Sequence, residues 1–202
     1  MCLIAFAWQA HADLPLVVAA NRDEFYARPT QTAHWWADYP DLFCGRDLEA
    51  GGSWLGINRH GRFAALTNIR DPHQLNPHAG SRGALVTEFL AGDMSAWEYA
   101  KAVLRNAHQY NGFNLLISTQ DELVYCNSLQ AEPRRLNSGI YALSNATLDT
   151  DWPKTQSARD KLTRWLGAPG DSRSLVQLLN SRRTATDSEL PRTGVPYDFE
   201  KA

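Results

Sequence analysis

The sequence has few cysteines, no excess charge of one sign and no long hydrophobic run, and each absence excludes a class of protein. Its 202 residues include three cysteines without paired spacing, which argues against a disulfide framework or a metal-binding knuckle. The 20 basic and 22 acidic residues are mixed along the chain and form no basic stripe for nucleic acid. Every apolar stretch is too short to span a bilayer. We therefore expect no metal, no nucleic-acid partner and no membrane span.

Two further sequence features are missing. The first residues lack a basic leader followed by a long apolar region, so we expect no export signal and a cytoplasmic protein. Gly51-Gly52 precedes a predicted strand and not a helix, so the dinucleotide-binding glycine fingerprint is absent. What is present is a 44% apolar composition, typical of a packed globular domain.

The order of predicted elements favours an α+β fold. Apolar, β-branched or aromatic runs predict strands at 2–8, 15–20, near 42–44, 54–57, 63–67, 113–118, 123–127 and 140–144. Residues 31–52 otherwise appear irregular in pattern. Helices are predicted over 82–90, over 95–106 with a capping box at Ser95 and Glu98, from Pro153 to about 166, and from 172 or 174 to 180. The predicted order is a group of strands, two helices, a second group of strands and two more helices. This order is typical of antiparallel sheets that are covered by pairs of helices.

Cys2 directly follows Met1 at the head of the first apolar run. Removal of Met1 would leave an α-amine and a thiol on one residue, which is a nucleophile together with its base. Their reference pKa values of about 8 and about 8.5 allow a reactive thiolate near neutral pH after modest shifts. The alternative is that Cys2 only begins a buried strand, since cysteine is among the most buried residues.

The block Asn21-Arg22-Asp23-Glu24 places four polar residues directly after an apolar strand. Alternate residues of a strand share a face, so Asn21 and Asp23 lie on one side and Arg22 and Glu24 on the other. An arginine here could lower a thiol pKa or bind a carboxylate with two hydrogen bonds. A solvated loop with local ion pairs is the alternative.

Asn58 and Asn145 each end a predicted apolar strand. A side-chain amide at a strand end can donate to a developing oxyanion without a change of charge. Asparagine is equally common in turns, and Asn58 stands where a hairpin turn is expected.

These motifs resemble the NRDE family, named for the block at 21–24, whose eukaryotic member is called transport and Golgi organisation protein 2. The matching segments run in order over most of the chain: Met1-Cys2, Asn21 to Phe25 with Arg28-Pro29, Gly51 to Asn58, Ala65 to Asn68, Ser81 to Gly83, Leu143 to Thr147 and Trp152 to Lys154.

The NRDE family is similar in turn to the N-terminal-nucleophile hydrolases, in particular to the cysteine branch that contains penicillin V acylase and bile-salt hydrolase. This resemblance implies a single domain over 1–202 with a four-layer αββα sandwich. It implies that Cys2 is the nucleophile, that Asn145 and Asn58 stabilise the oxyanion, and that Arg22 and Asp23 orient Cys2. Substrate contacts are expected from other residues of the shared motifs, namely Asn21, Glu24, Trp54, Asn68 and Arg82.

The chain departs from that branch at two points. Arg22 and Asp23 are adjacent here, whereas the hydrolases separate their arginine and aspartate by two residues, so Asp23 and Glu24 both remain candidates for the supporting carboxylate. The chain also stops at Ala202, and we expect it to lack a C-terminal strand pair that follows Pro191–Val195 in relatives.

Two functions follow from the resemblance. The first is a cysteine hydrolase, without a cofactor, that acts on a non-peptide C–N amide or related acyl bond of a small molecule. The second is a non-catalytic binding or trafficking protein for haem or an acyl lipid on the same fold. In that second case Cys2 could be a thiolate ligand to haem iron.

Overall fold

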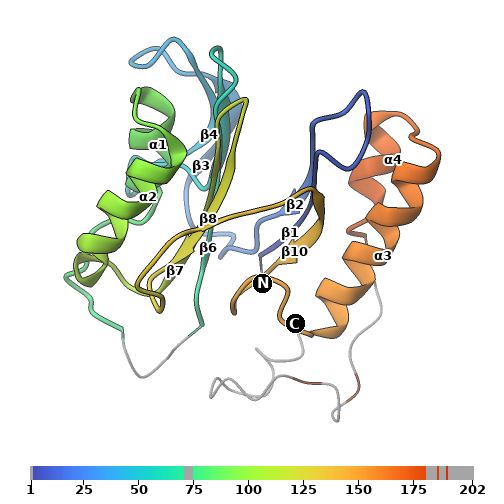
Figure 1. Cartoon of the computed structure of the whole chain (residues 1–202). Coiled ribbons are helices and arrows are strands. Elements are labelled where there is room, and N and C mark those ends of the chain that lie inside the picture. The colour runs from blue at the N-terminus through green and yellow to red at the C-terminus, as the bar shows by residue number, and fades with distance from the viewer. Residues whose placement is uncertain (1, 71–74, 181–185, 187–189, 191–202) are drawn as a thin grey trace. The chain divides into compact units, whose positions relative to one another are not determined.

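A computed structural model describes residues 2–70, 75–180, 186 and 190 of the chain (Figure 1). The chain divides into two compact units. The first comprises Met1–Asp23, Arg70–His73 and Asn137–Ala202, and the second comprises Glu24–Ile69 and Gln74–Leu136. The segment Pro191–Val195, after which a missing strand pair is expected, lies outside the described residues. The predicted single domain stays a prediction.

The first unit is a three-stranded antiparallel sheet packed against helices. The sheet order is β10-β1-β2, so the N-terminal strand is central. Helix α3 contacts β1 and β10, and α4 contacts β2. The bounds are β1 Leu3–Trp8, β2 Leu16–Asn21, β10 Gly139–Leu143, α3 Pro153–Gly167 and α4 Ser172–Gln177.

Both faces of β1 are buried, because the residues that point to either side of the strand are apolar. Leu3, Ala5 and Ala7 pack with Ala158, Leu162 and Leu166 of α3. On the other face Ile4 and Phe6 have no exposed area, and the Phe6 ring stacks on Tyr141 of β10 with ring centroids 5.2 Å apart. A strand buried on both sides reads as a continuous hydrophobic run, which explains the clear sequence signal of residues 3–8.

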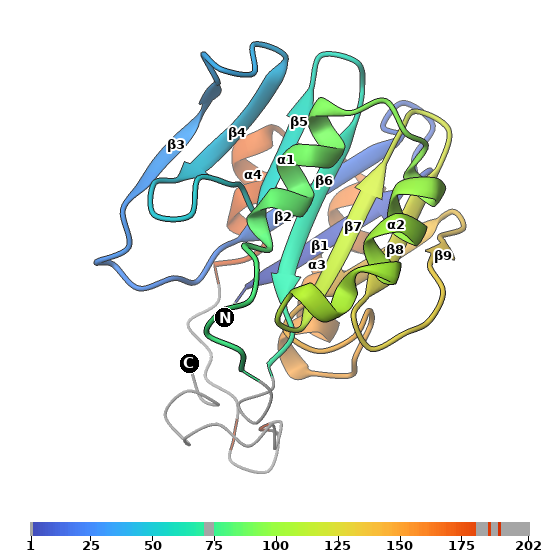
Figure 2. The ribbon, with the colours of Figure 1, turned by 90° about the vertical axis from the view of Figure 1, so that its left-hand side faces the viewer.

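The second unit is a seven-stranded antiparallel sheet in the order β3-β4-β5-β6-β7-β8-β9. Figure 2 shows helices α1 and α2 over β5 to β8, while β3 and β4 extend beyond the helix pair. The bounds are β3 Thr30–Trp35, β4 Leu42–Asp47, β5 Leu55–Asn58, β6 Phe63–Asn68, β7 Phe113–Ser118, β8 Leu123–Asn127, β9 Arg134–Arg135, α1 Gly83–Ala91, α2 Ala96–Arg105 and a 3-10 turn, Ala107–Gln109.

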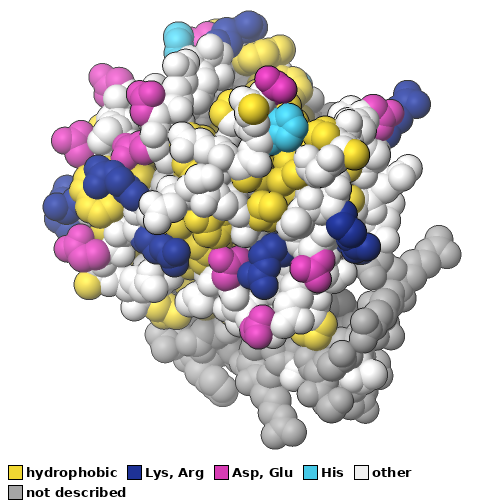
Figure 3. All heavy atoms as spheres, turned by 45° about the vertical axis from the view of Figure 1, so that its right-hand side comes forward, with side chains coloured by type: hydrophobic (Ala, Val, Ile, Leu, Met, Phe, Trp, Pro, Cys, Tyr) yellow, Lys and Arg dark blue, Asp and Glu magenta, His cyan; other side chains and the backbone are white. Residues whose placement is uncertain are grey.

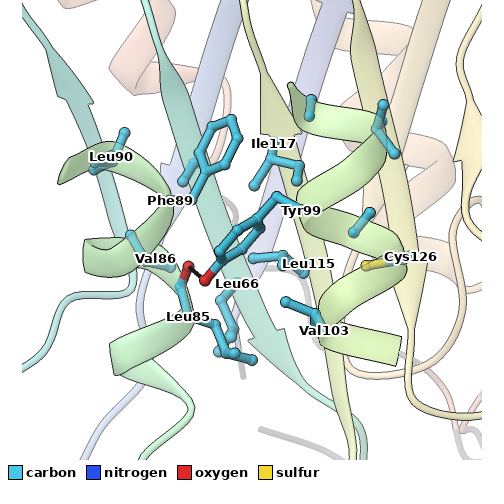
Figure 4. Packing of buried hydrophobic residues seen from close by; sticks show 14 of the residues in the cluster. Leu66, Leu85, Val86, Phe89, Leu90, Tyr99, Val103, Leu115, Ile117 and Cys126 are labelled. Carbon is cyan, nitrogen blue, oxygen red and sulfur yellow. Dashed lines mark hydrogen bonds between the residues drawn. The ribbon is translucent and has the colours of Figure 1, made fainter. Parts of the chain in front are cut away.

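The core of this unit lies between the helix pair and the sheet (Figure 4). Leu85, Val86, Phe89 and Leu90 of α1 are buried against strand residues, as the sequence pattern predicts. Tyr99 of α2 turns its ring into this core and donates its hydroxyl to the Leu85 carbonyl at 2.9 Å, so the one polar atom that the ring brings inside is satisfied.

Most predicted helix starts are confirmed. The Ser95 hydroxyl accepts from the Glu98 backbone at the start of α2, and Pro153 is the first residue of α3. Helix α4 begins at Ser172, with the Asp171 carboxylate accepting from the Ser174 backbone.

The prediction that residues 31–52 are irregular apart from a short strand near 42–44 is wrong at two places, because β3 occupies Thr30–Trp35 and β4 runs on to Asp47. The edge strand β3 is mostly exposed, so it has no buried face and no alternating hydrophobic pattern. Its ladder with β4 forms the strand, with a register shift between Gln31 and His34. The two-residue strand β9 was also not predicted.

The fold is therefore α+β, with two antiparallel sheets packed against helices, as predicted. On the face drawn in Figure 3, basic and acidic side chains are interspersed with hydrophobic ones. None of the helices in the described part of the chain is both long enough and apolar enough to cross a membrane.

Candidate functional site

Cys2 lies one residue before the central strand of the first unit. The residue is half-buried, and its Sγ lies 4.0 Å from the main-chain oxygen of Asp23. The thiol thus begins a strand whose following residues are all buried, while keeping part of its own surface exposed.

The strand registers bring Arg22 and Asn145 alongside Cys2. Leu3 pairs with Asn21 of β2, so one further step along the ladder sets Cys2 opposite Arg22. Ile4 pairs with Leu143 of β10, so two further steps set Cys2 opposite Asn145. Directly opposed residues of antiparallel strands share a face. Arg22 and Asn145, which are 20 and 143 positions from Cys2 in the sequence, thus follow the ends of the two strands that flank the start of β1.

The loop that carries Asn145 is held at several points. The main-chain carbonyl of Asn145 accepts from the Arg70 backbone at 2.8 Å. Ser144 is buried, and its hydroxyl donates to the Cys2 carbonyl at 2.8 Å. Further on, the Asp149 carboxylate accepts from the Ala142 backbone at 2.8 Å, which closes the loop onto β10.

The polar block at 21–24 falls at the boundary between the two compact units, which runs between Asp23 and Glu24. Asn21 ends β2 and is exposed, Arg22 is half-buried, and Asp23 is exposed. The Glu24 carboxylate accepts from the Phe25 backbone at 3.0 Å and lies 4.0 Å from the Arg28 guanidinium.

Asn58 forms a structural turn in the second unit, which is the alternative that its sequence position allows. Its Nδ2 donates to the Leu90 carbonyl at 2.7 Å, and its Oδ1 accepts from the His60 and Arg62 backbones, both at 2.9 Å. The side chain is buried and links the β5–β6 hairpin to the end of α1.

Three other predicted contact residues also belong to the second unit. Trp54 is half-buried just before β5, Asn68 is the exposed last residue of β6, and Arg82 precedes α1 and donates to the Gly112 carbonyl at 2.9 Å. The predicted residues thus divide between the units. Those in the first unit with Cys2 are Asn21, Arg22, Asp23 and Asn145, and those in the second are Glu24, Trp54, Asn58, Asn68 and Arg82.

A half-buried ion pair follows the polar block, and the sequence did not predict it. The Arg28 Nε donates to the Asp47 carboxylate at 2.7 Å, and Glu49 lies 3.3 Å from the same guanidinium. The hydrogen bond to Asp47 raises the pKa of Arg28. Burial favours the neutral form of Asp47, but the hydrogen bonds from Arg28 and from the Ala50 and Glu49 backbones outweigh it and lower the Asp47 pKa. The pair ties the segment after the polar block to the turn after β4.

The two glycines of that turn are needed for different physical reasons. Gly51 has a φ of +76°, in the left-handed region that favours glycine. Gly52 lies so close to Gly83 that a Cβ on it would be 2.5 Å from the Gly83 carbonyl carbon. The Gly51-Gly52 motif therefore lets the loop pack backbone to backbone on the start of α1.

The other two thiols differ from Cys2. Cys44 and Cys126 are buried, and burial raises the pKa of each, that of Cys126 to about 12. None of the three cysteines is in a disulfide bond. Within the described ranges, no group of three or more His, Cys, Asp and Glu side chains is arranged to hold a metal ion.

Comparison with known proteins identifies the family. The family model "Transport and Golgi organisation 2" matches residues 1–202. This chain belongs to the Transport and Golgi organisation 2 family. The family matches the resemblance that the NRDE motifs indicate.

Two mammalian members are close in sequence. The Transport and Golgi organization protein 2 homolog of Homo sapiens is 42% identical over 210 residues, which cover 95% of this chain and 74% of the human protein. The homolog of Mus musculus is 42% identical over 167 residues, or 76% of this chain. The chain spans about 60% of the length of the mouse and Bos taurus homologs.

A solved structure resembles this family member in fold. The Caenorhabditis elegans N-acylethanolamine-hydrolyzing acid amidase ortholog superposes with a TM-score of 0.60, over 90% of this chain and 86% of that one, at 11% identity. At this identity the likeness shows the fold alone. The Transport and Golgi organisation 2 chain thus has the fold of the N-terminal-nucleophile hydrolases.

Proposed function

We propose that this chain, after removal of Met1, is a cysteine hydrolase that acts on the C–N amide or related acyl bond of a small non-peptide molecule. The observation that carries the proposal is the position of Cys2 at the head of the central strand β1, flanked by the two strand ends that lead to Arg22 and to Asn145. A nucleophile, a cationic group and an amide donor on neighbouring strands are the parts that acyl transfer needs.

The reaction proceeds in two steps. The Cys2 sulfur attacks the carbonyl carbon of the substrate while the α-amine of Cys2 takes the thiol proton. The C–N bond then breaks, the leaving nitrogen takes that proton, and a thioester remains on Cys2. Water attacks the thioester and passes a proton to the α-amine, which returns it to the sulfur as the acid leaves.

Each neighbour has a role in these steps. The Asn145 amide stabilises the oxyanion of both tetrahedral intermediates, since it can donate a hydrogen bond without a change of charge. Arg22 favours the thiolate of Cys2 by its positive charge. We favour Asp23 over Glu24 as the supporting carboxylate residue, because the Asp23 main chain lies against the Cys2 sulfur and Glu24 bonds to its own neighbour Phe25.

We leave Asn58 out of the catalytic set. Its side chain already makes three hydrogen bonds within the second unit, and moving its amide to an oxyanion would leave the buried Leu90 carbonyl without that donor. The amidase whose fold is similar acts on N-acylethanolamines by its name. That name makes N-acyl amides the first substrate class to test.

The experiment is an acyl-enzyme trap read by intact mass. The purified chain is first checked for loss of Met1 and then treated with p-nitrophenyl acetate, followed by a panel of N-acyl p-nitroanilides with short and long acyl chains. We expect one acetyl group on Cys2, none on the Cys2→Ala variant, and release of p-nitroaniline from at least one anilide.

A retained Met1 or an unacylated Cys2 would overturn the proposal. Cys44 and Cys126 act as internal controls, because burial keeps both in the protonated form near neutral pH. Saturable binding of haemin or acyl-CoA that Cys2→Ala abolishes, without any acylation, would instead support the binding protein.

A further inference from the structure

We infer that Ser144 is a positioning residue that sets the placement of the Cys2 nucleophile relative to the Asn145 amide; the inference rests on the proposed hydrolase function. Ser144 follows β10 directly and is buried. Its hydroxyl donates to the main-chain carbonyl of Cys2 at 2.8 Å, across 142 positions of sequence. The same oxygen lies 3.4 Å from the Asn145 Oδ1.

The carbonyl contact fixes the part of Cys2 that the strand leaves least constrained. β1 begins at Leu3, so Cys2 lies just outside the named ladder. Once Met1 is removed, no preceding peptide holds the Cys2 main chain. A hydrogen bond to the Cys2 carbonyl orients the peptide plane between Cys2 and Leu3, and with it the Cα that carries both the amine and the thiol.

The contact with Asn145 extends this control to the second group. A hydroxyl carries one proton, and the shorter of its two contacts goes to the Cys2 carbonyl. The Ser144 oxygen therefore lies between the residue that attacks and the residue that stabilises the oxyanion. With the Asn145 Oδ1 on the Ser144 side, the Asn145 Nδ2 is on the other side of the carboxamide. The hydroxyl thus holds the Cys2 carbonyl by a hydrogen bond while its oxygen packs against the Asn145 carboxamide, and its loss alters the separation on which acyl transfer depends.

The chain offers a control with the same kind of bond at the opposite end of the same strand pair, at an exposed serine where Ser144 is buried. The Ser138 hydroxyl donates to the Gln9 carbonyl, also at 2.8 Å. Ser138 precedes β10 and Gln9 follows β1, so this bond joins the two strands as Ser144 and Cys2 do at the other end. Ser138 is remote from Cys2 along β1, and removal of its hydroxyl tests the loss of such a bond without the positioning effect.

The test uses two probes on the full chain. Acylation by p-nitrophenyl acetate needs the thiol aligned with the oxyanion donor, whereas alkylation by iodoacetamide needs only an accessible thiolate. We expect Ser144→Ala to slow acylation of Cys2 by roughly 10- to 100-fold, because small misplacements at a reacting centre have effects of this size. Alkylation should stay within about threefold of the parent chain, because the thiolate remains accessible. Ser138→Ala should change neither rate, and Ser144→Thr, which keeps a hydroxyl, should acylate faster than Ser144→Ala.

Each of the following results would overturn either the inference about Ser144 or the proposed function. Equal acylation rates for the parent chain and Ser144→Ala would overturn the inference and leave the proposed function intact. Labelling of Cys44 and Cys126 as well as Cys2 in Ser144→Ala would show that the hydroxyl only stabilises the fold, which also overturns it. A parent chain that is alkylated at Cys2 but never acylated would overturn the proposed function itself.

Discussion

The side-chain amide of Asn58 in β5 donates a hydrogen bond to the main-chain carbonyl of Leu90 in α1, with 2.7 Å between the two atoms. The Asn58 side-chain Oδ1 accepts from the backbone N–H groups of His60 and Arg62 after the strand. One buried side chain therefore joins a hairpin to the helix that covers it.

Replacement of Asn58 should cost stability. Asn58→Ala leaves one buried carbonyl and two backbone N–H groups without these partners, so we expect the free energy of unfolding to fall by about 2–4 kcal/mol. Urea denaturation followed by circular dichroism measures this change. A midpoint equal to that of the parent chain would contradict the structural role.

Replacement of Asn145 should leave the stability unchanged and lower the rate of Cys2 acylation. The Arg70 backbone bonds to the main-chain carbonyl of Asn145, and that bond survives the change to alanine. We expect Asn145→Ala to keep its unfolding midpoint and to lose roughly 100- to 1000-fold in the rate of Cys2 acylation, the usual effect of losing one oxyanion donor. Rapid-quench mass spectrometry gives the rate, with Asn58→Ala below its unfolding temperature as the control. An unchanged rate would remove Asn145 from the catalytic set.

The Asp47–Arg28 pair should make stability depend on pH. The folded-state pKa of Asp47 lies below its ordinary value of 3.8, so its contribution is present above that value and is lost as the pH falls through the lowered pKa. We expect Asp47→Asn to lower the free energy of unfolding by about 1–2 kcal/mol at pH 7, as for a hydrogen bond to a charged group. The difference from the parent chain should shrink towards pH 2.

Asp41→Asn is the matched control for that prediction. The Asp41 side chain is 53% exposed, and it lies 3.6 Å from the Arg59 Nε and 3.2 Å from the Nε2 of His60, whose ring is also exposed. Surface pairs contribute little, so unfolding of Asp41→Asn should match the parent chain at both pH values. Equal effects of the two variants would show that the half-buried Arg28–Asp47 pair contributes no more than a surface pair.

The close approach of Gly52 to Gly83 should make Gly52 intolerant of any side chain. A Cβ on Gly52 would lie 2.5 Å from the Gly83 carbonyl carbon and 2.9 Å from the Ala84 nitrogen, and these are backbone atoms that cannot turn aside. We expect Gly52→Ala to lower the free energy of unfolding by about 1–3 kcal/mol, as overpacking does. Gly167→Ala, at the end of α3 with no atom within 4 Å of the new Cβ, should be neutral or slightly stabilising. Thermal unfolding of both variants measures the difference, and equal midpoints would contradict the prediction.

Local patterns predicted the elements that have a strong hydrophobic signal. The apolar run from Leu3 to Trp8 is a strand, and the Ser95 cap and Pro153 begin helices as expected. Strand β3 was not predicted, because its side chains are mostly exposed and show no hydrophobic pattern. The strand is defined by its backbone pairing with β4. The Arg28–Asp47 pair was not predicted, because nothing in either segment indicates that two side chains 19 positions apart in the sequence come together.

By itself, the sequence determined that Cys2 begins an apolar strand, that polar residues follow the second strand, and that asparagines end two others. It could not separate Asn58 from Asn145, because both follow the same kind of apolar run. The tertiary structure decided their surroundings: β5 carries Asn58 to the end of α1, where its side chain bonds to Leu90, and β10, which pairs with β1, ends two residues before Asn145. The physical reason is that strand register and helix packing create hydrogen bonds between residues far apart in the chain, and no local pattern encodes those partners.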